Sequence, residues 1–189
     1  MNVVLCNGKG GTGKTTMTVL LAAALADAGH AAAVMDHDPQ ATATKWLAEA
    51  APEGVEIARA GGEYAGIFVD TPPVLTSPKL AAAIREADVV VVVSSPSPAD
   101  LWTSRDTAAL VKEHLRPKAK ARILFNQVQA NTVLAREMTE LADKIGLKPL
   151  KATVHRRQCY QHAALLGWKG LTTEARNEIT TLALEVVVR

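Results

Sequence analysis

A glycine-rich segment near the start of the sequence matches the pattern G-x-x-x-x-G-K-[ST]. It consists of Gly8, Lys9, Gly10, Gly11, Thr12, Gly13, Lys14 and Thr15. Glycines let the backbone curl so that successive N–H groups can point at phosphate oxygens. Lys14 is expected to reach the β- and γ-phosphates, and the Thr15 hydroxyl to ligate Mg²⁺. The segment therefore predicts a site that binds a nucleoside triphosphate with magnesium and hydrolyses ATP.

Aspartates follow two later apolar runs. Asp36 and Asp38 belong to the sequence Asp-His-Asp-Pro-Gln, and Asp70 opens the sequence Asp-Thr-Pro-Pro. An aspartate at a strand end beside a phosphate loop can hold magnesium and its waters, which suits Asp70. Asp38 is placed to orient the attacking water or accept its proton, and Asp36 could support either role. Asp-Pro alone is usually a turn signal, but two such turns and a phosphate loop together favour the functional interpretation.

The elements that must position these residues alternate between apolar, β-branched runs and helical patterns. We expect strands at residues 2–6, 31–36, 55–60, 67–70, 88–94, 121–126 and 149–154. Helices are expected at 15–28, 42–50, 79–86, 99–115 and 133–145, in one segment ending at 166, and at 173–188. This order predicts an α/β fold with a mostly parallel, twisted sheet flanked by helices on both faces, as one domain over residues 1–189. Ligands of such sheets bind at the carboxyl ends of the strands, so the motifs should meet there.

Composition narrows the class of protein. Hydrophobic residues make up 48% of the 189 residues, which excludes a disordered chain. We find no signal peptide and no apolar run near the ~18 residues of a membrane span. The two cysteines, Cys6 and Cys159, have no CxxC spacing, so a reduced, cytoplasmic compartment is the simplest interpretation. The five histidines show no metal-ligand spacing, and we expect no metal other than magnesium.

The two halves of the chain differ in charge. Residues 1–100 contain six Lys and Arg against eleven Asp and Glu, a net charge of −5, whereas residues 101–189 carry +7. Such asymmetry is typical of a basic surface for a polyanion, although an ordinary solvated face is equally compatible with it. The candidate contacts to DNA phosphates are Lys151, Arg156, Arg157 and Lys169.

The motifs together resemble those of the ParA/MinD-type ATPases. The segment from Lys9 to Thr16 is similar to their deviant Walker A motif, residues 36–40 to their D-x-D-P-Q switch, and residues 70–73 to their Walker B motif. The short chain, without a helix-turn-helix extension before the loop, resembles the ParF-like plasmid partition ATPases. Residues 96–100 and 153–160 also agree with that branch, so the resemblance spans nearly the whole chain.

This resemblance implies a nucleotide-sandwich homodimer in which Lys9 crosses to the partner's nucleotide and Thr16 belongs to the nucleotide site. It implies that the ATP dimer binds non-specific DNA on the nucleoid, and that a ParB-like or adaptor protein stimulates hydrolysis and resets it. Asn126 follows a strand, where related proteins recognise adenine with an amide, but an Asx turn is an equal alternative.

The sequence departs from these relatives between residues 61 and 66, where a short segment stands in place of a helix before the Walker B strand. Two other functions remain open. A membrane-positioning ATPase of MinD type needs a basic amphipathic anchor, and residues 185–189 carry one base and one acid, so we expect no stable membrane association. A metabolic ATP-dependent enzyme needs a substrate pocket, which the sequence does not locate.

Overall fold

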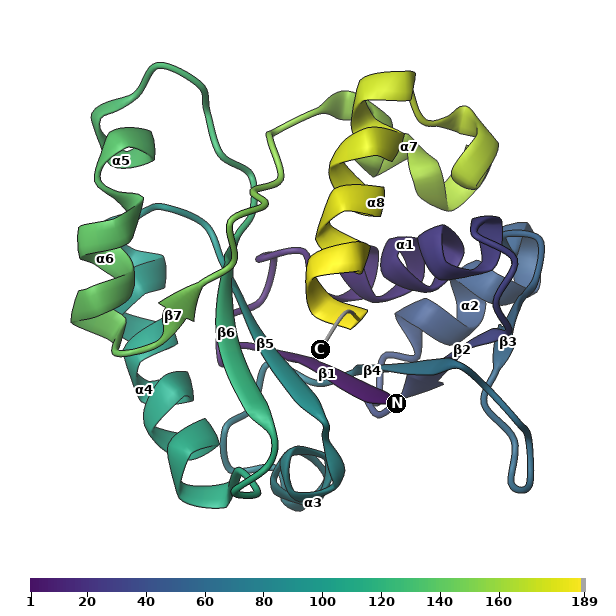
Figure 1. Ribbon diagram of the computed structural model, residues 1–189, viewed down its shortest axis with the longest axis horizontal. Coiled ribbons are helices and arrows are strands. Elements are labelled where there is room, and N and C mark those ends of the chain that lie inside the picture. The colour runs from purple at the N-terminus through teal and green to yellow at the C-terminus, as the bar shows by residue number, and fades with distance from the viewer. Residues whose placement is uncertain (188–189) are drawn as a thin grey trace.

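A computed structural model describes residues 1–187, and in them seven parallel strands form one sheet (Figure 1). The strands are β1 (Asn2–Cys6), β2 (Ala32–Asp36), β3 (Val55–Ile57), β4 (Gly66–Asp70), β5 (Val89–Ser94), β6 (Lys120–Phe125) and β7 (Lys148–Pro149). Their order is β3-β2-β4-β1-β5-β6-β7. The chain leaves β1 toward one edge of the sheet and later returns to build the other, so the carboxyl end of β1 lies at a switch point where such sheets bind ligands.

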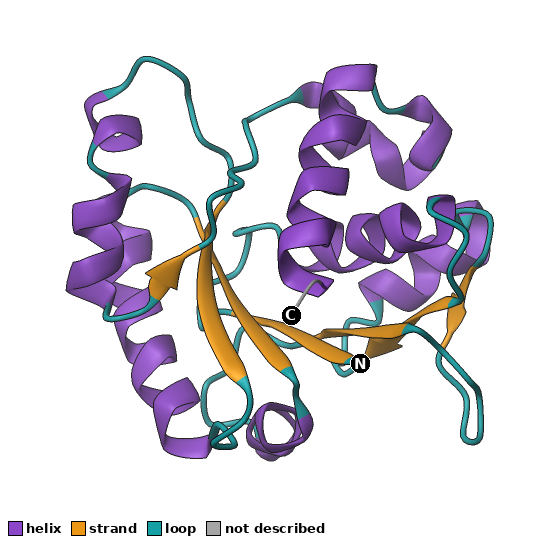
Figure 2. Cartoon of the chain, viewed as in Figure 1, coloured by secondary structure: helices purple, strands orange, loops and turns teal. Residues whose placement is uncertain are grey.

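Helices cover both faces of the sheet (Figure 2). They are α1 (Lys14–Asp27), α2 (Thr42–Ala50), α3 (Pro78–Glu86), α4 (Pro98–His114), α5 (Val133–Arg136), α6 (Met138–Ile145), α7 (Gln158–Leu166), the 3₁₀ turn η1 (Trp168–Gly170) and α8 (Thr173–Val187). Helices α1, α2, α7 and α8 pack on one face, and α3, α4 and α6 on the other. Within residues 1–187, no helix combines the length and the apolar character that a membrane crossing requires.

Alternation along the central strands produces one apolar core on each face. In β1, Val3 and Leu5 face the α1 and α8 side, whereas Val4 and Cys6 face the α3 and α4 side. Every residue of β5 is buried, as expected for a strand covered on both faces. The predicted α/β architecture is therefore confirmed.

The strand expected at residues 149–154 is mostly wrong, because β7 ends at Pro149. The Leu150 N–H still donates to the Ile123 carbonyl of β6 at 2.9 Å. The next N–H on that side, of Ala152, binds the carboxylate of Glu185 on α8 at 2.9 Å instead, and the Lys151 N–H binds the same carboxylate at 2.8 Å. The chain rejoins that side of the sheet at Val154, whose N–H donates to the Phe125 carbonyl at 3.0 Å.

Smaller corrections concern element ends. The helix expected at 133–145 is broken at Glu137 into α5 and α6, and nothing in the structure explains the break. The expected cap is present, since the Thr132 hydroxyl accepts the Ala135 N–H. Strand β3 stops at Ile57 rather than at residue 60, and Val188, the expected end of the last helix, lies outside the described residues.

The segment between β3 and β4 contains no helix within the described chain, as the sequence predicts. It forms a projecting loop that turns at Gly61 (Figure 1). The Tyr64 hydroxyl closes it by donating to Glu56 at 2.6 Å and accepting the Arg59 N–H at 3.3 Å. The sheet edge at β2 and β3 is thus covered by a helix on one face only.

Two leucines of α8 allow a test of the packing on the face of the sheet that carries α1. Leu182 is fully buried in that core, whereas Leu184, two residues further along the helix, is 58% exposed. Leu182→Ala is expected to lower the free energy of unfolding by about 2–5 kcal/mol, because it removes buried methyl groups and leaves a cavity. Urea denaturation of the matched variant Leu184→Ala should show a change within about 0.5 kcal/mol. Equal losses in both variants would contradict this packing.

Candidate nucleotide-binding site

The glycine-rich loop lies between β1 and α1, at the carboxyl end of the central strand. Gly11 and Gly13 have φ angles of 78° and 93°, which residues with a Cβ atom rarely adopt. A Cβ at Gly13 would also lie 2.3 Å from the amide nitrogen of Asn126. Both backbone conformation and packing therefore require glycine at this position.

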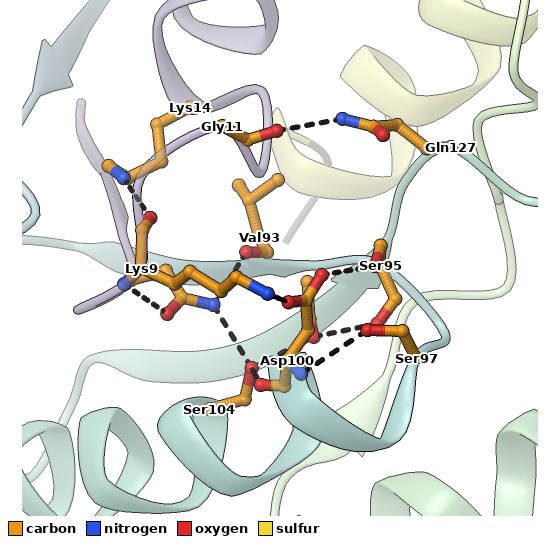
Figure 3. A network of polar contacts seen from close by, with 11 residues as sticks. Lys9, Gly11, Lys14, Val93, Ser95, Ser97, Asp100, Ser104 and Gln127 are labelled. Atoms are coloured by element: carbon orange, nitrogen blue, oxygen red, sulfur yellow. Dashed lines mark hydrogen bonds and ion pairs between the residues drawn. The ribbon is translucent and has the colours of Figure 1, made fainter.

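Two side-chain amides hold the carbonyl groups of the loop. The amide of Asn126 donates to the Thr12 carbonyl at 2.7 Å, and that of Gln127 donates to the Gly11 carbonyl at 2.9 Å (Figure 3 draws the second contact). Because these two carbonyls are held by the amides, the neighbouring N–H groups of the loop remain available to an anion. Asn126 thus contacts the loop in this structure, and its role in adenine recognition stays a prediction. The sequence analysis missed Gln127, whose φ of 57° marks a constrained backbone.

Lys14 is directed back along the loop, where its ammonium donates to the Lys9 carbonyl at 2.9 Å. The residue is only 6% exposed. Burial lowers the pKa of Lys14, while the Asp70 carboxylate acts in the opposite direction. A phosphate group in the loop would supply the negative charge that this buried ammonium needs.

Asp70 lies at the end of β4, beside Asp36 at the end of β2. Its Oδ2 accepts the Thr15 hydroxyl at 2.7 Å, and its buried Oδ1 has no hydrogen-bond partner among the described residues. Burial raises the pKa of Asp70 to about 6. A hydroxyl and an unpaired carboxylate oxygen are hard donors, so Thr15 and Asp70 fit Mg²⁺, directly or through its waters.

The other two aspartates organise the turn after β2. Asp36 accepts the Asp38 N–H at 3.0 Å with Oδ1, and the N–H and hydroxyl of Thr44 at 2.9 and 3.0 Å with Oδ2. Asp38 accepts the Gln40 N–H at 2.9 Å. These contacts order the turn at the carboxyl end of the strands, where Asp70 also lies. The magnesium role of Asp36 and the water-orienting role of Asp38 stay predictions.

Lys9 points away from its own loop, toward the start of α4 (Figure 3). Its ammonium forms an ion pair with Asp100, which also accepts the Ser95 hydroxyl. Burial favours the neutral form of Asp100, but hydrogen bonds from Lys9 and the two serines at 95 and 97 outweigh it and lower the pKa of this carboxyl. The side chain of Lys9 remains 42% exposed. Ser97 caps α4 three residues before Asp100, a spacing that could have drawn attention to this carboxylate.

Helix α4 also holds the start of the loop. Asn7 donates to the Ser104 hydroxyl at 3.0 Å and to the Val93 carbonyl at 2.8 Å, and the Gly8 N–H donates to Thr107 at 3.1 Å. The polar side chains of Asn7, Ser104 and Thr107 are all buried. The sequence analysis missed this network because its members lie nearly a hundred residues apart in the chain.

The four basic residues expected to contact DNA do not form one compact cluster. Arg157 is ion-paired with Glu178 at 2.6 Å, and Lys169 lies 3.4 Å from Glu53. Arg156 and Lys151 are exposed and form no ion pair within residues 1–187. Arg156 lines a cavity with the first turn of α1, whereas Lys169 lines one at the last turn of α1, about 15 Å further along that helix.

The fold and the site together define a P-loop nucleotide-binding protein with a second lysine at the start of its loop. The chain belongs to the family described as the CobQ/CobB/MinD/ParA nucleotide binding domain, whose model matches residues 3–167. The expected ParA/MinD-type relationship is confirmed, and so are the ATPase activity and the use of ATP with Mg²⁺.

Relatives are similar over most of the chain. A protein of Halothiobacillus neapolitanus named maintenance of carboxysome distribution protein A is 27% identical, over 98% of this chain and 95% of its own length. The protein of the same name from Gloeobacter kilaueensis is 34% identical, over 89% of this chain and 85% of its own length.

Solved structures share the fold at low sequence identity. The MinD cell division protein of Aquifex aeolicus superimposes with a TM-score of 0.80 at 16% identity, over 100% of this chain and 97% of that one. The septum site-determining protein MinD of Pyrococcus horikoshii, complexed with Mg-ADP, gives 0.76 at 18% identity, over 98% and 95%. These similarities establish the architecture alone.

The position of Lys14 leads to a prediction for nucleotide binding. Lys14→Ala removes the ammonium that neutralises phosphate charge and should lower ATP hydrolysis by about 100-fold or more. The fold should survive, because the ammonium contacts only one loop carbonyl. Phosphate release and circular dichroism check both statements, with Lys79→Ala on the surface of α3 as the control. Normal turnover in Lys14→Ala would contradict the site.

Proposed function

We propose that this protein is a positioning ATPase that dimerises with ATP, binds non-specific DNA in that state, and is reset when a partner protein stimulates hydrolysis. The observation that carries the proposal is the different direction of two lysines in one loop. Lys14 is buried and directed along the loop, whereas Lys9 is half-exposed and directed to α4. One lysine is available to the protein's own nucleotide and the other to a nucleotide held by a second copy.

The proposed dimer requires Lys9 to leave Asp100. In the single chain their ion pair offsets the charge of a mostly buried carboxylate, so a facing nucleotide must offer Lys9 a stronger attraction. A triphosphate carries several negative charges and can do so. ATP would then join two copies, whereas a nucleotide without the γ-phosphate would attract Lys9 less strongly.

In the proposed hydrolytic site, Thr15 and Asp70, supported by Asp36, would hold Mg²⁺, which would supply positive charge to the phosphates. Asp38 orients water or accepts its proton. The turn contacts of Asp38 and Asp36 support this role, because they fix the backbone that carries both carboxylates. Lys14 stabilises the charge on the phosphates.

The nucleoside end of ATP is proposed to extend from the loop into a cavity of about 130 Å³. This cavity is lined by Gly13, Thr16, Met17, Asn126, Gln127, His155, Arg156, Arg157, Tyr160 and Gln161. Its walls come from the loop, the first turn of α1, the end of β6 and the start of α7. The proposed nucleotide-binding residues Thr16 and Asn126 therefore border the same space.

DNA binding is proposed to rest first on Arg156 and Lys151, which form no ion pair in residues 1–187. Arg157 and Lys169 would contribute less, because each already faces a glutamate. Two copies joined by ATP present twice as many basic groups to one duplex, so the dimer binds more tightly without new contact chemistry. Association with the nucleoid follows from such binding.

The cargo we propose is a protein assembly of the carboxysome kind rather than a plasmid. The support is the name shared by both relatives, which align over most of their own length with this chain. The reset partner is then an adaptor protein on that assembly. Deleting the gene for this chain in its own cell, with the assemblies fluorescently labelled, tests this choice. Without the protein, the assemblies should cluster, whereas plasmid inheritance should be unchanged.

The dimer leads to a prediction for Lys9. Lys9→Ala should still bind ATP as a monomer but should lose hydrolysis and ATP-dependent dimerisation, because the ammonium reaching the second nucleotide is missing. Sedimentation with a slowly hydrolysed ATP analogue, at tens-of-micromolar concentrations suited to weak association, measures this. The double variant Lys9→Ala/Asp100→Ala also removes the carboxylate left unpaired and should behave alike. Dimerisation of either variant like wild type would contradict the proposal.

The basic residues lead to a prediction for DNA. Wild type with ATP should bind duplexes of any sequence, with a log–log salt slope of about −0.9 for each phosphate neutralised. Lys151→Glu/Arg156→Glu should weaken binding uniformly across sequences. Lys79→Glu, an equal charge change per residue on α3, serves as the control. Gel shifts with ATP and with ADP measure the binding of wild type and of each variant. If wild type with ATP did not bind duplex DNA at low salt, the nucleoid role would be excluded.

A further inference from the structure

Five hydrogen bonds from three residues converge on one carboxylate, that of Glu178 on α8. The Arg157 guanidinium donates twice to Oε1, at 2.6 and 3.3 Å. The Tyr160 hydroxyl donates to Oε2 at 2.8 Å, as does the His155 backbone N–H at 3.2 Å. The His155 ring nitrogen lies 2.8 Å from Oε1. All three residues belong to one short segment, 155–160, which precedes and begins α7.

This carboxylate is held as an anion. Its side chain is only 15% exposed. Although burial favours the neutral form, the hydrogen bonds from Arg157, Tyr160 and His155 outweigh it and lower the pKa of Glu178. A buried anion with this many donors fixes the geometry of the groups around it, because breaking any one contact leaves part of its charge unpaired.

Segment 155–160 forms one wall of the cavity beside the phosphate loop. His155, Arg157 and Tyr160 line this cavity opposite Gly13 and Thr16. The backbone of the segment is joined at its beginning to the chain that follows β6, where the Arg156 N–H donates to the Val128 carbonyl at 3.0 Å. Beyond that point, its side chains bond to α8: Arg157 and Tyr160 to Glu178, and the Tyr160 hydroxyl also, at 3.2 Å, to the Ala175 carbonyl.

We propose that Glu178 is a positioning residue for nucleotide binding, which sets the cavity wall without itself lining the cavity. The inference rests on the proposed placement of ATP in the loop and cavity. Helix α8 carries no residue that lines the cavity, yet through Glu178 it fixes three that do. A change in α8 is therefore transmitted to the affinity for nucleotide.

The same helix supplies a matched control. Glu185 lies seven residues after Glu178, about 10 Å along the axis. It also binds a loop, through the N–H groups of Lys151 and Ala152 at 2.8 and 2.9 Å. Glu185 itself lines a different cavity, together with Leu150 and with Met1, which directly precedes β1 at the end of the sheet opposite the phosphate loop. Both glutamates thus accept hydrogen bonds from a neighbouring segment, but Glu185 lies farther from the proposed nucleotide site than Glu178.

The test measures binding of a slowly hydrolysed ATP analogue with Mg²⁺ to the full chain by calorimetry. Glu178→Ala should weaken binding by about tenfold, the effect of losing hydrogen bonds to a charged group. Glu185→Ala should bind as wild type, although both variants lose stability in urea. If Glu178→Ala does not fold, Glu178→Gln keeps the shape, removes the ion pair and should show the same direction.

A double-mutant cycle separates positioning from a general loss of packing. If Arg157 acts through Glu178, the effects of Arg157→Ala and Glu178→Ala on affinity are not additive, and the double variant resembles either single one. Equal affinity of wild type, Glu178→Ala and Glu178→Gln would overturn the inference. Failure of the nucleotide site itself looks different: Lys14→Ala would then bind the analogue as tightly as wild type.

Discussion

The phosphate loop can bind an anion only if its carbonyl groups are held away from the site, and much of the structure meets that constraint. Positive φ angles at Gly11 and Gly13 curl the chain at the end of β1. The amides of Asn126 and Gln127, from the end of β6, then fix the carbonyls of Thr12 and Gly11. Because β6 lies two strands from β1, the loop keeps its shape only in the assembled sheet. Binding competence is thus a property of the fold and not of the motif alone.

Charge imposes the second constraint. Lys14 and Asp70 are buried close to each other, each at the cost of desolvation, and neither is fully satisfied by the chain. In the proposed site, a triphosphate would supply negative charge to Lys14, and a magnesium ion would supply positive charge to Asp70. Lys9 differs because Asp100 already neutralises it. Lys14 and Asp70 thus lack a full counter-charge within the chain, whereas Lys9 is already paired with Asp100 on α4.

The sequence predicted what is local in the chain. The loop, the aspartates at the ends of β2 and β4, and the apolar strands were recognisable because each depends on neighbouring residues. The roles of Gln127 and Glu178 were not, because their partners are 116 and about 20 residues away and Gln or Glu has no preferred pattern there. The prediction for strand β7 was wrong for the same reason: Glu185, more than 30 residues later, binds the Ala152 N–H, which would otherwise continue the ladder with β6.

Distance also bears on how DNA and nucleotide could communicate. Arg156 lies beside the first turn of α1, next to the loop, while Lys169 lies beside the last turn, about 15 Å further along that helix. A duplex that contacted both would run along α1 and α7, past the segment that Glu178 holds. Arg156 is inside that segment, and its neighbour Arg157 is tied to α8. A contact that displaced Arg156 would therefore move the wall of the cavity proposed for the nucleotide, so DNA and ATP would act on the same segment of the chain.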